Sequence, residues 1–100
     1  MSTPRLTDTS SVRFEVRSIE WANSGRLVAL ATVAIDIEGV ELVLQGIQIM
    51  REPDGTWTVR APRWRHPGSG KWVPAVVLPD ELQDAIGVEV LGRITSQSVM

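Results

Sequence analysis

The sequence contains no cysteine and only one histidine, His66. The absence of cysteine excludes a disulfide scaffold, a CxxC redox centre and any thiolate metal site, and it is typical of proteins in a reducing cytosol. A metal site at His66 is not expected, because the chain has no second histidine and no carboxylate at ligand spacing from it. We therefore predict a cytoplasmic protein without a cofactor.

Long apolar runs and catalytic motifs are missing as well. The longest apolar segment, residues 27–37, is interrupted by Thr32 and Asp36 and is shorter than the roughly 18 residues that a membrane-spanning helix needs. The first eleven residues lack the apolar stretch of a secretory signal. No G-x-S-x-G or P-loop glycine pattern occurs. These absences predict a protein that is not an enzyme, has no small-molecule substrate and has no membrane partner.

The charges are unevenly distributed along the chain. The net charge is −2, but residues 51–72 carry five basic residues against two acidic ones, and the rest of the chain carries five basic residues against ten acidic ones. Between Trp57 and Trp72 there are four cations and no anion. A cationic segment on an acidic protein can bind phosphate groups locally.

Alternating apolar and polar residues indicate β-strands. This pattern predicts strands at residues 12–21, 26–37, 40–50 and 56–61, and a short fifth strand at residues 71–77 that Pro74 interrupts. Residues 26–37 are apolar on both faces and are expected at the centre of a sheet. Changes in the alternation near Ser18 and at Gly46 predict β-bulges. Residues 63–70 contain Pro67 and two glycines and are expected to form an irregular loop.

One helix is expected after Pro79, which suits the first helical position. Its apolar stripe consists of Leu82, Ala85, Ile86 and Val90, and its first turns carry Asp80, Glu81 and Asp84. The helix dipole explains these carboxylates without a metal site. Gly87 costs about 1 kcal/mol relative to alanine, so the helix is expected to be short or frayed after Ile86 and to close at Gly92.

These elements predict an α+β fold: an antiparallel β-meander of four to five strands with one C-terminal α-helix. Residues 12–91 are expected to form a single domain. A flexible N-terminal arm, residues 1–11, and a C-terminal tail, residues 92–100, would flank it.

The order of several motifs resembles the SpoVG family, the stage V sporulation protein G or septation regulator group. Residues 25–36 are similar to the family's G-K/R-L-x-A-x-A-S/T-V-x-F/I-D strand, and Ile47-Gln48-Ile49 is similar to its next strand. The similarity continues over residues 59–72 and 78–86; its matching positions there are Val59, Pro62, Arg63, Arg65, Pro67, Gly70, Trp72, Leu78, Pro79 and the run Gln83-Asp84-Ala85-Ile86. The resemblance covers roughly residues 12–91 and implies a small homodimeric bacterial regulator that binds DNA or RNA.

Five side chains are the candidate nucleic-acid-binding residues: Arg60, Arg63, Trp64, Arg65 and Lys71. Cations displace counterions from phosphate, and flat side chains stack on exposed bases. Trp64 is the preferred stacking residue, because it lies between two arginines in a Pro/Gly-rich segment with no strand pattern to bury it. Trp57 and Trp72, by contrast, are expected to pack on the sheet.

A second interpretation fits the same residues. Trp and Arg are also the residues that anchor protein interfaces, so the composition equally allows a non-enzymatic interaction module that binds a protein partner through its Trp/Arg loop and edge strands. The sequence does not decide between the two.

Overall fold

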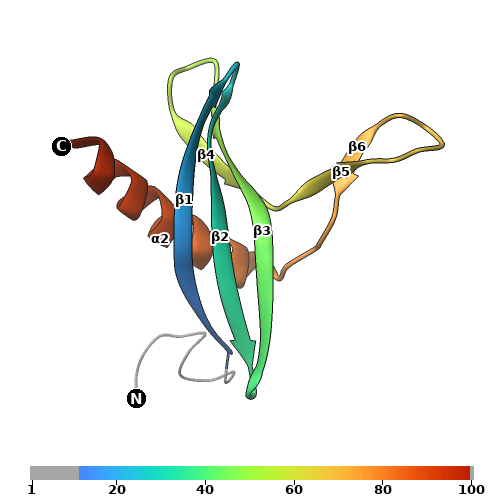
Figure 1. Ribbon diagram of the computed structural model, residues 1–100, viewed down its shortest axis with the longest axis vertical. Helices are drawn as coiled ribbons and strands as arrows, with labels where there is room; N and C mark the ends of the chain where they lie inside the picture. The colour runs from blue at the N-terminus through green and yellow to red at the C-terminus, as the bar shows by residue number, and fades with distance from the viewer. Residues whose placement is uncertain (1–11, 100) are drawn as a thin grey trace.

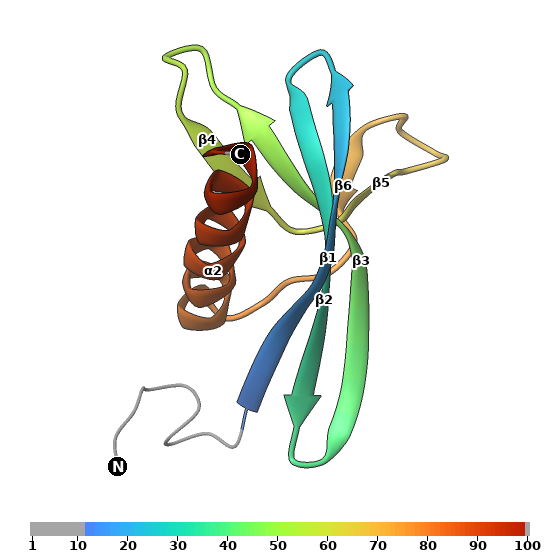
Figure 2. The ribbon, with the colours of Figure 1, turned by 60° about the vertical axis from the view of Figure 1, so that its left-hand side comes forward.

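The computed structural model describes residues 12–99, so the expected N-terminal arm lies outside the described residues. A four-stranded antiparallel sheet runs in the order β1 (Val12–Ser24), β2 (Leu27–Ile37), β3 (Val40–Arg51) and β4 (Trp57–Arg60). One helix, α2 (Asp80–Val99), lies against one face of this sheet (Figures 1 and 2). A second, small sheet consists of β5 (Arg63–Arg65) and β6 (Trp72–Pro74), and it projects away from the four-stranded sheet. The predicted α+β meander with a C-terminal helix is confirmed.

The turns and bulges follow the sequence signals. Asn23 and Gly25 have positive φ at the β1–β2 turn, and Glu38 and Gly39 have positive φ at the β2–β3 turn. The register between β2 and β3 slips where Gly46, with a φ of 83°, adds an extra residue to β3. The register between β1 and β2 slips between Val16 and Ser18. Both predicted bulges and the central position of β2 are therefore confirmed.

A single core fills the space between the sheet and α2. Its buried members are Val16, Val28, Ala29, Ala31, Val33, Ile35, Ile47, Ile49, Leu82, Ile86, Val90 and Ile94. Directly paired residues of an antiparallel sheet share a face, so the pairs Ala31–Ile47 and Ala29–Ile49 both present their side chains to the helix. The small alanines of β2 leave room for the larger helix side chains.

The helix is longer than its glycines suggest. It continues through Gly87 and Gly92 to Val99, so the predicted end at Gly92 and the predicted tail after it were wrong. Val90 and Ile94 explain the difference, since both are fully buried on the sheet. Burying one large aliphatic side chain stabilises by about 1.5–3 kcal/mol, which exceeds the roughly 1 kcal/mol that each glycine costs. Among the described residues, no helix is long and apolar enough to cross a membrane.

Replacing Val90 with alanine should lower the free energy of unfolding by about 2 kcal/mol, because the change removes two methyl groups from a packed core. Val88, 74% exposed on the same helix, provides the matched control. We expect Val88→Ala to change the stability by no more than about 0.5 kcal/mol. Urea unfolding followed by circular dichroism measures both, and equal effects would contradict the placement of the helix on the sheet.

Candidate nucleic-acid interface

The cationic segment forms a separate β-hairpin, residues 63–74, called here the β5–β6 hairpin. Arg63 pairs with Pro74, Trp64 with Val73, and Arg65 with Trp72. The expectation of an irregular loop at residues 63–70 was therefore wrong for Arg63–Arg65. The reason is the pairing with residues 72–74, which lie beyond the Pro/Gly-rich turn and supply the hydrogen bonds of the second strand. Figure 1 shows the hairpin extending away from the main sheet.

A proline lies at each end of the hairpin: Pro62 immediately precedes it, and Pro74 is its last residue. Pro62 cannot donate to a sheet ladder, and β4, an edge strand of the main sheet, ends at Arg60 just before it. The Pro62 carbonyl accepts a hydrogen bond from the Ala75 amide at 2.7 Å, which closes the base just beyond Pro74. The hairpin is thus anchored where it leaves the sheet and where it returns.

His66 organises the tip of the hairpin. Its backbone amide donates to the Lys71 carbonyl, and the Gly70 amide donates to the His66 carbonyl, both at 2.8 Å. The His66 Nδ1 atom accepts hydrogen bonds from the amides of Gly68 at 3.0 Å and Ser69 at 3.2 Å. Gly70 adopts a φ of 73°, which favours glycine. His66 therefore has a structural role in the turn.

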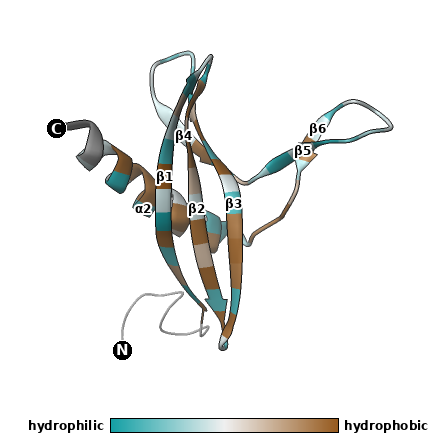
Figure 3. Cartoon of the chain, viewed as in Figure 1, coloured by the Kyte–Doolittle hydropathy of each residue, from teal (hydrophilic) through white to brown (hydrophobic). Residues whose placement is uncertain are grey.

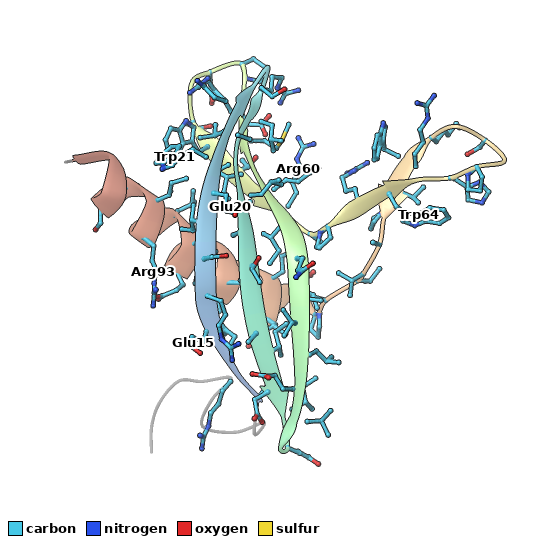
Figure 4. The ribbon with its side chains drawn as sticks, viewed as in Figure 1. Glu15, Glu20, Trp21, Arg60, Trp64 and Arg93 are labelled. Atoms are coloured by element: carbon cyan, nitrogen blue, oxygen red, sulfur yellow. The ribbon has the colours of Figure 1, made fainter. Side chains whose placement is uncertain are left out.

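The register divides the hairpin into two faces. Directly paired residues share a face and neighbours alternate, so Arg63, Arg65 and Trp72 lie on one side, called here the Trp72 face. Trp64 and Val73 lie on the other side, the Trp64 face. The His66–Lys71 hydrogen bond extends the same register and places Lys71 on the Trp64 face. Figure 4 shows Trp64 on the hairpin, well away from the main sheet.

Both hairpin tryptophans are accessible. Trp64 is 44% exposed and Trp72 is 58% exposed. The expectation that Trp72 packs on the main sheet was wrong, because its strand pairs with β5 and leaves that sheet altogether. Trp57 does pack as predicted: it contacts the core, and its ring meets Trp21 edge-on at a centroid distance of 6.4 Å. Trp64 lies beside His66, with 5.4 Å between the ring centroids.

The hairpin cations have no acidic neighbours in the surrounding chain. No carboxylate occurs from Thr56 through Pro79. Within residues 12–99, none of the salt bridges involves Arg63, Arg65 or Lys71. Arg63 donates to the Trp72 carbonyl at 3.0 Å, and Arg65 donates to the Gly70 carbonyl at 3.2 Å. These bonds orient both guanidinium groups and leave their charges without a counterion from the described protein.

Arg60 differs from the other candidates. It lies on β4 in the main sheet, and its guanidinium is 3.3 Å from the Glu52 carboxylate. The Glu52 carboxylate also forms a salt bridge with Arg26 at 2.7 Å, and it accepts a hydrogen bond from the Thr58 hydroxyl. The Thr58 hydrogen bond, and then the charges of Arg26 and Arg60, lower the pKa of Glu52, although desolvation acts in the opposite direction. Arg60, which is labelled in Figure 4, thus belongs to this ion-pair network and not to the hairpin.

The structure thus brings Arg63, Trp64, Arg65 and Lys71 together in one hairpin and leaves Arg60 outside it. It also adds Trp72, which sequence reasoning assigned to the main sheet. The alternation of Arg63, Trp64 and Arg65 is the signal that could have identified a strand here, and with it a tryptophan on the arginine side.

Comparisons with protein-family models, with curated proteins and with solved structures find no match for this chain. The resemblance to the SpoVG family stays a prediction from the order of the motifs.

The Glu52 network has a consequence for acid stability. A carboxylate with a lowered pKa stabilises the folded state above its unfolded pKa, and this contribution disappears as the pH falls through the folded-state pKa. For Glu52 this loss occurs below the ordinary value of 4.5. We expect Glu52→Gln to be less stable than the native chain at neutral pH, and the difference to shrink in acid. Urea unfolding from about pH 7 to about pH 3 tests this.

Glu20 is the matched control, because it is exposed and, within residues 12–99, takes part in no salt bridge. Glu20→Gln should leave the pH profile close to that of the native chain. A Glu52→Gln profile parallel to the native one at all pH values would contradict the role of the network.

Proposed function

We propose that this chain is a small, non-enzymatic regulatory protein that binds single-stranded nucleic acid through the Trp72 face of the β5–β6 hairpin. The observation that carries the proposal is the register of β5 and β6, which puts an exposed indole on the same face as two arginines. The cation-only segment around the hairpin and the resemblance to a family of DNA- and RNA-binding regulators support it.

The chemistry of this face suits unpaired bases and their phosphates. Arginine contacts phosphate oxygens with a planar fork of donors, and an exposed indole provides a surface on which a base stacks. Three residues of a strand extend about 10 Å, so the face spans no more than a few nucleotides. A two-stranded ribbon also fits the major groove of a duplex, so duplex DNA is a necessary comparison.

Removing the two charges of this face should weaken binding and reduce its salt dependence. We expect Arg63→Gln/Arg65→Gln to lower the magnitude of the slope of log K against log salt by about 1.4, since each phosphate contact contributes about 0.7 for single strands. Glutamine keeps a hydrogen-bond donor for the carbonyls that these arginines contact. Fluorescence anisotropy with labelled single-stranded DNA, single-stranded RNA and duplex DNA gives the affinities.

The control variant Arg13→Gln/Arg51→Gln removes the same total charge from the main sheet. It should reduce the affinity much less. The proposal fails if native protein does not bind any of the three oligonucleotides at low salt, or if both double variants have the same effect. Tighter binding to duplex DNA than to either single strand would indicate that the hairpin binds in a groove of the duplex, and it would contradict base stacking on Trp72.

The two hairpin tryptophans should differ in their effect on binding. Stacking of one base contributes about 1–3 kcal/mol, so Trp72→Ala should weaken single-strand binding by roughly 5- to 150-fold. Trp64→Ala should weaken it less, because Trp64 lies on the opposite face from Arg63 and Arg65. Titrations of both variants under the same conditions make the comparison. A larger loss for Trp64→Ala would move the binding site to the Trp64 face.

The homodimer that the resemblance implies belongs to the same proposal. A dimer would present two hairpins, and two linked hairpins that contact the same nucleic-acid strand bind it more tightly than one hairpin alone. Light scattering of the native protein reports the number of copies, and a monomer at every concentration would remove the dimer from the proposal.

A further inference from the structure

Within residues 12–99, an apolar strip at one end of the main sheet lies outside the area that α2 covers. Ile37, Val40 and Leu42 are 40%, 62% and 48% exposed. Ile37 pairs with Val40, and Leu42 pairs with the buried Ile35, so all three share the face on which α2 packs. Figure 2 shows that this end of the sheet continues past the start of α2, and Figure 3 shows the apolar colour of β3 there. The core surface therefore continues beyond the helix that covers it.

The turn at the end of the strip and the first turn of α2 both carry acidic residues. Glu38 lies in the turn that joins Ile37 to Val40, and within residues 12–99 it takes part in no salt bridge. Asp80 and Glu81 form the first turn of α2, which lies on the same side of the sheet (Figure 2). A contiguous exposed apolar surface with a charged rim is typical of a binding site. The chemistry that complements it is an apolar surface with a positive charge.

The Trp64 face of the β5–β6 hairpin has this chemistry. It presents the indole of Trp64, the partly buried Val73 and the cation Lys71. It lies opposite the Trp72 face, so a partner on one face leaves the other accessible. Aromatic anchors that enter an apolar site with a polar rim are the usual centre of protein interfaces.

We propose that the Trp64 face docks on the apolar strip of a second copy of this chain, with Lys71 toward the acidic rim. Two copies make the contact reciprocally, each hairpin reaching the strip of its partner. The inference rests on the proposed function only in assigning the Trp72 face to nucleic acid. It names the surface of the dimer and separates the roles of the two tryptophans.

Sedimentation equilibrium or light scattering over a range of concentrations and salt tests the contact. We expect native protein to dimerise, and the dimer to weaken as salt increases, because opposite charges contribute to it. Trp64→Ala and Val40→Lys should both shift the population to monomer, from opposite sides of the same contact. Trp72→Ala, the control on the other face, should dimerise like native protein.

A charge-exchange experiment excludes general damage to the fold. Lys71→Glu alone and Val40→Lys alone should each be monomeric. Mixed in equal amounts they should form a heterodimer, because one contact joins the two introduced opposite charges and the reciprocal contact is native. Failure of the mixture to dimerise, a native chain that is monomeric at its highest soluble concentration, or a dimer that neither substitution weakens would overturn the proposal.

The same variants separate this proposal from nucleic-acid binding. Monomeric Val40→Lys should retain single-site affinity for a short oligonucleotide, since its Trp72 face is unchanged. If native protein dimerises as described but binds no oligonucleotide, the proposed function fails and the dimer contact stands. If Val40→Lys is monomeric and binds no oligonucleotide while native protein does, the two faces are not independent, and the assignment of the Trp64 face fails.

Discussion

The packing of the apolar stripe of α2 on the main sheet is the interaction on which the rest of the structure depends. Leu82, Ile86, Val90 and Ile94 lie on the small residues of β2 and the isoleucines of β3, and together these residues of the helix and the two strands form most of the buried core. In a chain of one hundred residues without disulfides, this single interface must supply most of the stability. It holds the helix together across Gly87 and Gly92, and it fixes the point to which the chain must return after the β5–β6 hairpin.

That constraint explains why the hairpin can project. The main sheet and α2 provide all the buried residues of the core, and residues 63–74 contribute none. They are held by their own ladder, by the base contact between Pro62 and Ala75, and by the turn around His66. A two-stranded hairpin anchored in this way presents side chains on both faces to solvent. The same feature makes it suitable for two different contacts, one on each side.

Much of the fold could be predicted from local patterns. The alternation in residues 12–61, the turns with Gly25 and Gly39 and the bulge at Gly46 are properties of short segments, and the structure retains them. The errors arose where distant residues decide. Arg63–Arg65 becomes a strand only because Trp72–Pro74 pairs with it, and the helix extends past Gly92 only because Ile94 reaches the sheet. Local propensity disfavours a helix that continues through Gly87 and Gly92, and tertiary contacts outweigh it.

For the candidate site, the sequence by itself determined the chemistry: a run of arginines, a lysine and two tryptophans without a carboxylate between Thr56 and Pro79. It could not determine the geometry, because a linear segment does not reveal its own pairing register. Tertiary structure decided that Arg60 forms a salt bridge with Glu52 in the main sheet and that Trp72 faces solvent. It also placed Trp64 opposite the arginines that flank it in the chain. The physical reason is the two-residue period of a β-strand, which puts sequence neighbours on opposite faces and brings Arg65 and Trp72 to the same one.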